Sequence, residues 1–236
     1  MIASVHIADV SRRSALALLR RAPRPATTRG LRHANVALTA PLSGSVLPSP
    51  DFGRVGLVAF WDDDEALDGF LSDHPMAATL AGGWHVRLAP RRASGAWPGL
   101  PSDVSTERDV EEGDIEQEGA AAVLTLGRLR LTQTVRFFRA SARAEAAAVE
   151  APGLIWATGL ARPPFVATCS LWQSAQALST YAYGRGGPAH AAAIAAHEIK
   201  PFHHESAFIR FRPYGSRGSL VGRNPLAETW TSAVGR

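Results

Sequence analysis

The chain has 236 residues, of which 46% are hydrophobic and 19% are charged, with a net charge of +4. This balance is ordinary for a soluble globular protein, and the length allows one large domain or two small ones with a real core. The single cysteine, Cys169, excludes a disulfide framework and a cysteine-based zinc site, and no apolar run is long enough for a membrane-spanning helix.

The first half of the chain is expected to form six elements. Its first ten residues have neither a basic start nor a long apolar core, so we expect no signal peptide and a cytoplasmic protein. Strands are expected where polar and apolar residues alternate, and helices where apolar residues recur every three or four positions. The expected order is strand 3–10, helix 12–22, strand 33–40, strand 54–61, helix 62–71 and strand 84–90.

The second half shows the same order of elements. We expect strand 121–131, helix 132–150, strand 153–160, strand 165–172, helix 174–183 and strand 204–213. Between the halves, "SDVSTERDVEEGDIEQEG" (102–119) is acidic, contains glycine and has little periodicity, which is typical of a linker.

Two segments of the first half recur in the second half, which indicates an internal repeat. "AFWDDDEALDGFL" (59–71) matches "SLWQSAQALSTYA" (170–182), with Trp61 over Trp172. "RLAPRRASGAWPG" (87–99) matches "RFRPYGSRGSLVG" (210–222), with arginine, proline and two glycines at the same offsets. The offset is 111 residues for the first pair and 123 for the second, so the second half carries 12 additional residues between its two segments.

The repeated order predicts an α+β protein of two fused ferredoxin-like (βαββαβ) repeats, which pack sheet to sheet as a dimeric α+β barrel within one chain. The predicted boundaries are 1–101 for the first repeat, 102–119 for the acidic linker and 120–236 for the second repeat. We expect the halves to enclose an apolar hollow.

The additional residues include an alanine-rich stretch with two histidines, "PAHAAAIAAHE" (188–198). On a helix that begins at Pro188, the side chains of His190, Ile194 and His197 lie along one stripe. Two turns separate the imidazoles by about 10.5 Å, so they cannot hold one bare metal ion together. They can line one pocket, in which one imidazole ligates a large planar cofactor; the other interpretation is a packing helix with partly exposed histidines.

Two other candidates for a ligand site are less specific. "FHHES" (202–206) places His203 and His204 on opposite faces of the expected strand, beside Glu205, but its spacing defines no metal geometry. Cys169 is a candidate thiolate ligand of iron, although a buried thiol on a strand is usually a small apolar side chain.

A cluster of arginines near the N-terminus is a candidate surface for binding an anionic partner, such as a membrane or a nucleic acid. It comprises Arg12, Arg13, Arg20, Arg21, Arg24, Arg29 and Arg32. The cluster allows peripheral contact with an anionic membrane, but the absence of interleaved aromatic residues or a nucleic-acid-binding module favours a solvated surface and no nucleic-acid partner.

The segment 154–222 resembles the spheroidene monooxygenase family of carotenoid oxygenases, as a divergent member. The residues that carry the resemblance are "SLWQSAQALSTYAY" (170–183), His190 with its alanines, and "ESAFIRFRPYGSRGSLVG" (205–222). The resemblance implies a haem-dependent monooxygenase that uses dioxygen and an electron donor to oxidise a hydrophobic small molecule, such as a carotenoid or another polyprenoid.

The same resemblance implies roles for individual residues. His190 is the expected axial ligand of the iron of haem b, and Tyr181 and Trp172 are further expected cofactor-binding residues, together with Ile194 from the helix stripe. Trp172, Tyr181, Phe211 and Arg210 fall on framework positions of the family, so a structural role is the alternative for them. His197 and Arg210 are the candidate catalytic residues on the distal side. A cofactor-free monooxygenase of the same barrel type and a non-catalytic carrier of hydrophobic ligands are the alternatives, and a monomer or a homodimer is compatible with the two complementary halves.

Overall fold

The computed structural model describes residues 1–45, 49–101, 104, 119–183 and 200–227. The predicted linker, apart from residues 104 and 119, and the predicted histidine helix therefore lie outside the described residues. None of the helices in the described part of the chain is long and apolar enough to cross a membrane.

The first half contributes four strands and three helices. They are β1 (Ile2–Asp9), α1 (Arg12–Arg20), β2 (Leu31–Ala40), β3 (Asp51–Trp61), α2 (Asp64–Asp73), α3 (Pro75–Leu80) and β4 (Trp84–Gly95). All six expected elements are present, and the short helix α3 is an addition that the sequence analysis missed.

The second half repeats the order of strands. Its elements are β5 (Ala121–Leu129), the 3₁₀ helix η2 (Leu131–Gln133), α4 (Thr134–Val149), β6 (Leu154–Arg162), β7 (Phe165–Trp172), α5 (Ala175–Tyr183) and β8 (His203–Gly218). The last strand is longer than predicted, because it continues past Pro213 and pairs with β4 as far as Gly218.

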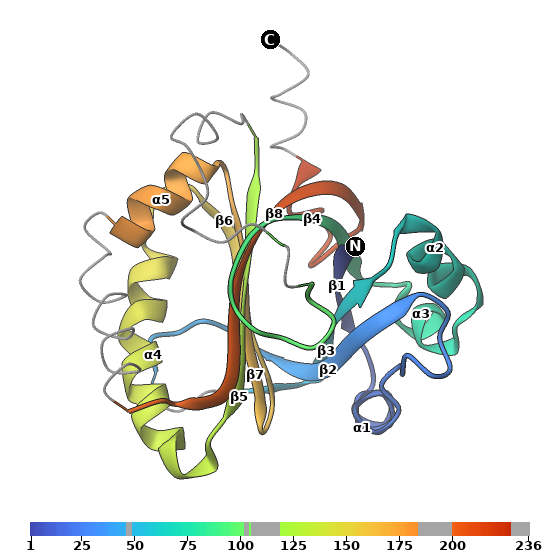
Figure 1. Ribbon diagram of the computed structural model, residues 1–236, viewed down its shortest axis with the longest axis horizontal. Coiled ribbons are helices and arrows are strands. Elements are labelled where there is room, and N and C mark those ends of the chain that lie inside the picture. The colour runs from blue at the N-terminus through green and yellow to red at the C-terminus, as the bar shows by residue number, and fades with distance from the viewer. Residues whose placement is uncertain (46–48, 102–103, 105–118, 184–199, 228–236) are drawn as a thin grey trace.

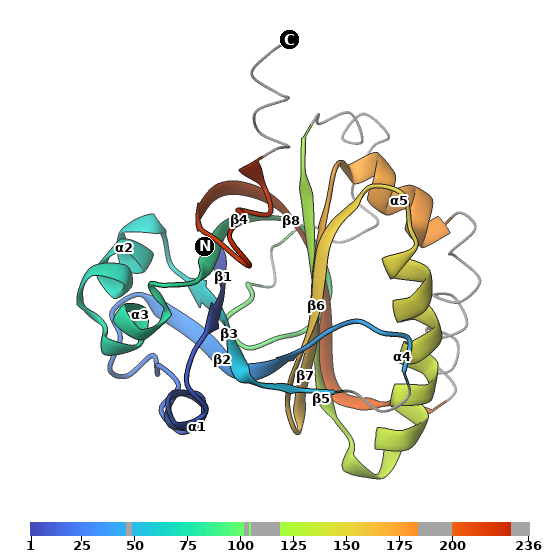
Figure 2. The same cartoon turned by 180° about the vertical axis from the view of Figure 1, so that it is seen from behind.

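The eight strands form one closed antiparallel barrel in the order β1-β3-β2-β6-β7-β5-β8-β4. Each half contributes a four-stranded sheet, and α1–α3 lie on the outside of the first sheet while α4 and α5 lie on the outside of the second (Figures 1 and 2). The α+β barrel predicted from the sequence is therefore confirmed.

Two seams join the halves, and they differ in length. Strands β4 and β8 pair at eleven positions, from Trp84 with Gly218 to Gly95 with Ala207. Strands β2 and β6 pair at three positions, from Leu38 with Ala161 to Ala40 with Gly159.

Local capping explains where helix α2 begins. The carboxylate of Asp63 accepts the backbone N–H of Ala66 at 2.9 Å, and Asp64 and Glu65 follow in the first turn. Carboxylates at this end of a helix satisfy free N–H groups and interact favourably with the helix dipole.

Gly95 at the end of β4 is predicted to be intolerant of a side chain. Its φ is +82°, and a Cβ would overlap the carbonyl oxygen of Ser206 on β8. We expect Gly95→Ala to lower the free energy of unfolding by about 2–5 kcal/mol, because left-handed strain and a backbone clash add together. Gly69→Ala in α2 is the control: a Cβ there meets no atom within 4 Å, so chemical denaturation should show unchanged or slightly raised stability.

Candidate functional site

The interior of the barrel is filled by apolar side chains from both halves. Val5, Phe60, Leu124 and Ile209 have no accessible surface and belong to one core cluster. Cys169 lies in the same core, where burial raises the pKa of its thiol to about 12, so it packs as a small apolar side chain. Within the described residues, the expectation of an apolar hollow between the sheets is therefore wrong, because side chains occupy that space.

The outer face of the second sheet has a different character. In antiparallel ladders, directly opposed residues point to the same face of the sheet. Leu124, Cys169 and Ile209 are opposed to one another and point into the core, so the next row, Val123, Ser170 and Arg210, points outward. This outer face is the one that α4 and α5 flank (Figures 1 and 2).

Two apolar clusters attach the helices to this outer face, one at each end. At the α5 end, Trp172 and Leu178 are buried against Val123, with Tyr181 and Phe208 packed beside them. At the other end, the cluster comprises Leu129, Val166 and Phe202, with Phe137 and Ala140 of α4 packed against it.

Between the two clusters, the side chains of the described residues leave part of the outer face uncovered. Thr125 is exposed although it lies in the middle of β5, between β7 and β8, and on the face that the helices flank. A Cβ at Gly127 would meet the ring of His203, so this ring covers the sheet one position further along the same face. We call the uncovered region around Thr125, between Phe208 and His203, the Thr125 opening.

Helix α4 is loosely packed above this opening. Of its sixteen residues only Ala142 and Ala148 are buried. Burial raises the pKa of Glu145 on the same helix, although the carboxylate accepts a backbone hydrogen bond from Ser43. Helix α4 therefore buries few of its side chains against the described part of the second half.

In the first half, the equivalent position on the outer face of the sheet is covered by side chains. His6 on β1 and Thr125 on β5 are equivalent, because each lies four residues after the residue that pairs with the aligned tryptophan. His6 is only 3% exposed, and its ring stacks on His85 with centroids 5.1 Å apart. Leu67 and Phe70 of α2 are buried over this sheet. Among the described residues, this position is therefore exposed in the second half and covered in the first.

Trp172 and Tyr181, two of the predicted cofactor-binding residues, lie together at the edge of the opening. Their rings stack at 5.0 Å between centroids. The indole N–H of Trp172 donates to Ser170 Oγ at 3.0 Å, and the Tyr181 hydroxyl donates to the carbonyl of Ala144 at 3.1 Å. Burial and, to a smaller degree, Glu145 raise the pKa of Tyr181, which therefore remains a neutral donor. The pair forms a rigid aromatic wall.

Arg210, a predicted catalytic residue, lies on the same outer face. Its neighbour across the ladder is Val123, and Phe208 lies two residues before it on β8. The guanidinium carbon is 5.9 Å from the centroid of the Phe208 ring. Its Nε is buried and has no hydrogen-bond acceptor, which is costly for a cationic donor. The hydrogen bonding of this guanidinium is therefore incomplete within the described part of the chain.

The remaining predicted residues are not brought together by the described structure. His190, Ile194 and His197 lie outside the described residues, so their roles stay predictions. Among the described residues, no group of three histidine, cysteine or acidic side chains can hold a metal ion, and this includes "FHHES". There His204 is exposed, whereas His203 packs edge-on against Phe137 with ring centroids 5.1 Å apart.

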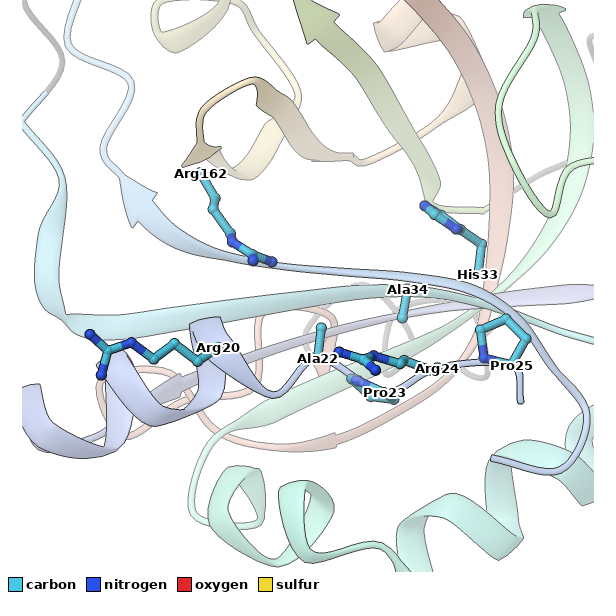
Figure 3. Close-up of a pocket in the computed structure, with 8 residues that line it drawn as sticks. All are labelled: Arg20, Ala22, Pro23, Arg24, Pro25, His33, Ala34 and Arg162. Atoms are coloured by element: carbon cyan, nitrogen blue, oxygen red, sulfur yellow. The ribbon is translucent and has the colours of Figure 1, made fainter. Parts of the chain in front are cut away.

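A separate basic pocket of about 290 Å³ lies outside the barrel, where β2 approaches β6 (Figure 3). Arg20 and Arg24 of the N-terminal arginine cluster and Arg162 at the end of β6 line it, with His33 and Ala34 on β2. The three arginines suit this pocket to an anion. We therefore do not assign it to the apolar substrate of the predicted monooxygenase.

Thr125 and Glu145 were not among the residues predicted from the sequence. A threonine on the outer face of a strand is unremarkable in isolation, and the packing of α4 cannot be read from its alanines. Thr125 could have been found by comparing the two halves residue by residue, because it stands where the first half has His6.

Two curated proteins are similar to this chain, whereas no family model matches it. Spheroidene monooxygenase of Cereibacter sphaeroides is 25% identical over 193 residues, which are 78% of this chain and 57% of that protein. Spheroidene monooxygenase of Rhodobacter capsulatus is 24% identical over 195 residues, 77% of this chain and 75% of that protein. The resemblance predicted from the sequence is confirmed, and the chain spans little more than half the length of the first relative.

Solved structures with a similar fold include aldoxime dehydratase. One such structure superposes with a TM-score of 0.54 at 10% identity and covers 90% of this chain and 80% of the other. A second, in complex with butyraldoxime, gives a TM-score of 0.52 at 10% identity and covers 90% and 79% of the two chains. At this identity the similarity supports the α+β barrel alone.

Proposed function

We propose that the chain is a haem-dependent monooxygenase that inserts oxygen into a hydrophobic substrate, with carotenoids or other polyprenoids as the substrate class. Two spheroidene monooxygenases among its relatives support the reaction class. The observation that carries the site is the Thr125 opening, which exists in one half of a duplicated fold and is closed by side chains in the other.

The described residues around the opening fit a flat, largely apolar group with a charged edge. Thr125 and Thr168 form a floor of short side chains, and the stacked Trp172 and Tyr181 form an aromatic wall. Arg210 supplies a buried donor that lacks an acceptor. A porphyrin has both properties, since its ring is planar and apolar and its propionates are anionic.

The protein residues have separate roles in this proposal. Haem would supply the activation of dioxygen, and His190 would hold its iron through a neutral imidazole. Trp172, Tyr181 and Phe208 would exclude water from the apolar substrate, and His197 would form a hydrogen bond with dioxygen or the substrate. An external electron donor completes the reaction.

The proposal is tested by absorption spectroscopy of the protein as isolated and after titration with haemin. We expect a Soret band at one haem per chain, and we expect His190→Ala to abolish or shift it. His204→Ala, which removes an exposed histidine of the same half, is the control and should leave the band unchanged. A spectrum that His190→Ala does not alter removes the ligand assignment. Oxygen consumption without haem uptake identifies the cofactor-free enzyme, and tight binding of a polyprenoid without turnover identifies a carrier.

A further inference from the structure

The two halves carry the same outward-facing arginine with different partners. Arg87 on β4 pairs across the ladder with Ser4 of β1, and Arg210 on β8 pairs with Val123 of β5. Ser4 and Val123 each lie two residues after the residue opposite the aligned tryptophan. Arg87 and Arg210 therefore occupy the same place in the fold, in agreement with the sequence repeat.

In the first half this arginine is neutralised by helix α2. Arg87 Nη1 lies 2.5 Å from Asp64 Oδ1, and Nη2 forms an ion pair with Asp68. Asp64 also accepts a hydrogen bond from the Tyr214 hydroxyl at 2.9 Å. The guanidinium is thus held by two carboxylates one turn apart on one helix.

In the second half both carboxylates are missing. The repeat places Ala175 at the position of Asp64 and Ser179 at the position of Asp68, both on α5. Within the described part of the chain no carboxylate forms an ion pair with Arg210, and its Nε has no acceptor. The cation has been kept while the two anions that hold it in the other copy have been lost.

We propose that Arg210 binds a carboxylate of the ligand that occupies the Thr125 opening, in place of the aspartates that hold Arg87. This inference rests on the proposed function in taking the opening as the ligand site. Arg210 and Thr125 are diagonal neighbours on the outer face, because Val123 and Thr125 are successive outward residues of β5. A guanidinium recognises a carboxylate through two parallel N–H···O bonds, which are stronger than neutral hydrogen bonds.

The carboxylate has two chemical sources, a porphyrin propionate or the acid group of a long apolar molecule, and two pairs of probes distinguish them. Haemin is compared with its dimethyl ester by absorbance, and cis-parinaric acid with its methyl ester by fluorescence. In the arm that matches the ligand, the free acid should bind about 10-fold to 100-fold more tightly than the ester, as expected for a charge-assisted bidentate pair.

Two variants test the residue from opposite directions. Arg210→Gln removes the cation, and the double variant Ala175→Asp with Ser179→Asp restores the two carboxylates of the first half. Both should reduce the preference for the acid to less than about threefold, a residual set by the general solubility difference between acid and ester. The double variant should unfold at the same temperature or higher, because Arg210 regains internal partners. Arg12→Gln, on the exposed face of α1, should keep the full preference.

The outcomes separate this inference from the proposed function. If the acid and the ester bind equally well in both arms, or if Arg210→Gln still prefers the acid by about 10-fold or more, the inference is overturned. Loss of haem uptake together with an Arg210-dependent preference for parinaric acid overturns haem dependence and retains the carboxylate site. A preference for haemin that depends on Arg210 supports both.

Discussion

Thr125→Trp is expected to abolish uptake of the ligand by the second half while the protein remains folded. Thr125 is exposed in the middle of the outer face, between the aromatic wall at Trp172 and the ring of His203. An indole at this position fills the space that the ligand needs. The first half supports this reasoning, because a ring at the equivalent position, that of His6, is buried and completes the packing of the layer.

The measurement is a haemin titration followed by absorbance, together with oxygen consumption and chemical denaturation. Haem binding should fall by at least 100-fold, since displacement of a planar ligand from its floor leaves no alternative pose. The free energy of unfolding should stay the same or rise, because the indole buries apolar surface. Thr180→Trp, at an exposed position of α5, controls for the introduction of a tryptophan. Full haem uptake by Thr125→Trp would place the ligand elsewhere.

Acid is expected to destabilise the protein strongly, with His6 as the main source. Burial, together with smaller contributions from the charges of His85 and Arg87, lowers the pKa of His6 from 6.5 to about 3. The folded state therefore keeps this imidazole neutral, whereas the unfolded chain protonates it below pH 6.5. The contribution of the neutral His6 to the free energy of unfolding is fully present above pH 6.5. It is lost as the pH falls toward 3, by roughly 4–5 kcal/mol in total.

Removal of the imidazole should flatten this dependence. His6→Leu keeps an apolar side chain of similar size, and Ser4 Oγ still accepts the indole N–H of Trp61, at 2.9 Å in the wild type. Urea denaturation between pH 7.5 and 4 should show a slope smaller by about 1.4 kcal/mol per pH unit than in the wild type. Some slope should persist, because burial also lowers the pKa of His85 and His33. A slope in His6→Leu equal to that of the wild type would contradict the assignment.

The fold could be predicted from the sequence because its determinants are local. The alternation of residues in "HESAFIRFRP" and the carboxylates before α2 specify a strand and a helix start without knowledge of the partner elements. The repeat of Trp61 and Trp172 then implied two copies of one unit. The helix α3 was missed because its six residues are too few to show a period.

The site could be predicted only in part, because it depends on how side chains pack between α4 and the strands of the second sheet. Trp172, Tyr181 and Arg210 were identified from the sequence and lie near one another on the outer face. Their expected location, a hollow between the sheets, was wrong, since no local pattern shows that the side chains of both sheets fill the barrel. The exposure of Thr125 depends on how far α4 stands from the strands, which is a property of tertiary packing.

The unequal seams between the halves have a consequence for local unfolding. Opening the barrel along β2 and β6 breaks three paired positions, whereas opening it along β4 and β8 breaks eleven. The free energy of opening is therefore lower along β2 and β6, and amide hydrogens there exchange with solvent through fluctuations that leave the rest of the barrel intact. We expect the two sheets to stay joined along β4 and β8 during such fluctuations, because this seam has the larger number of paired positions.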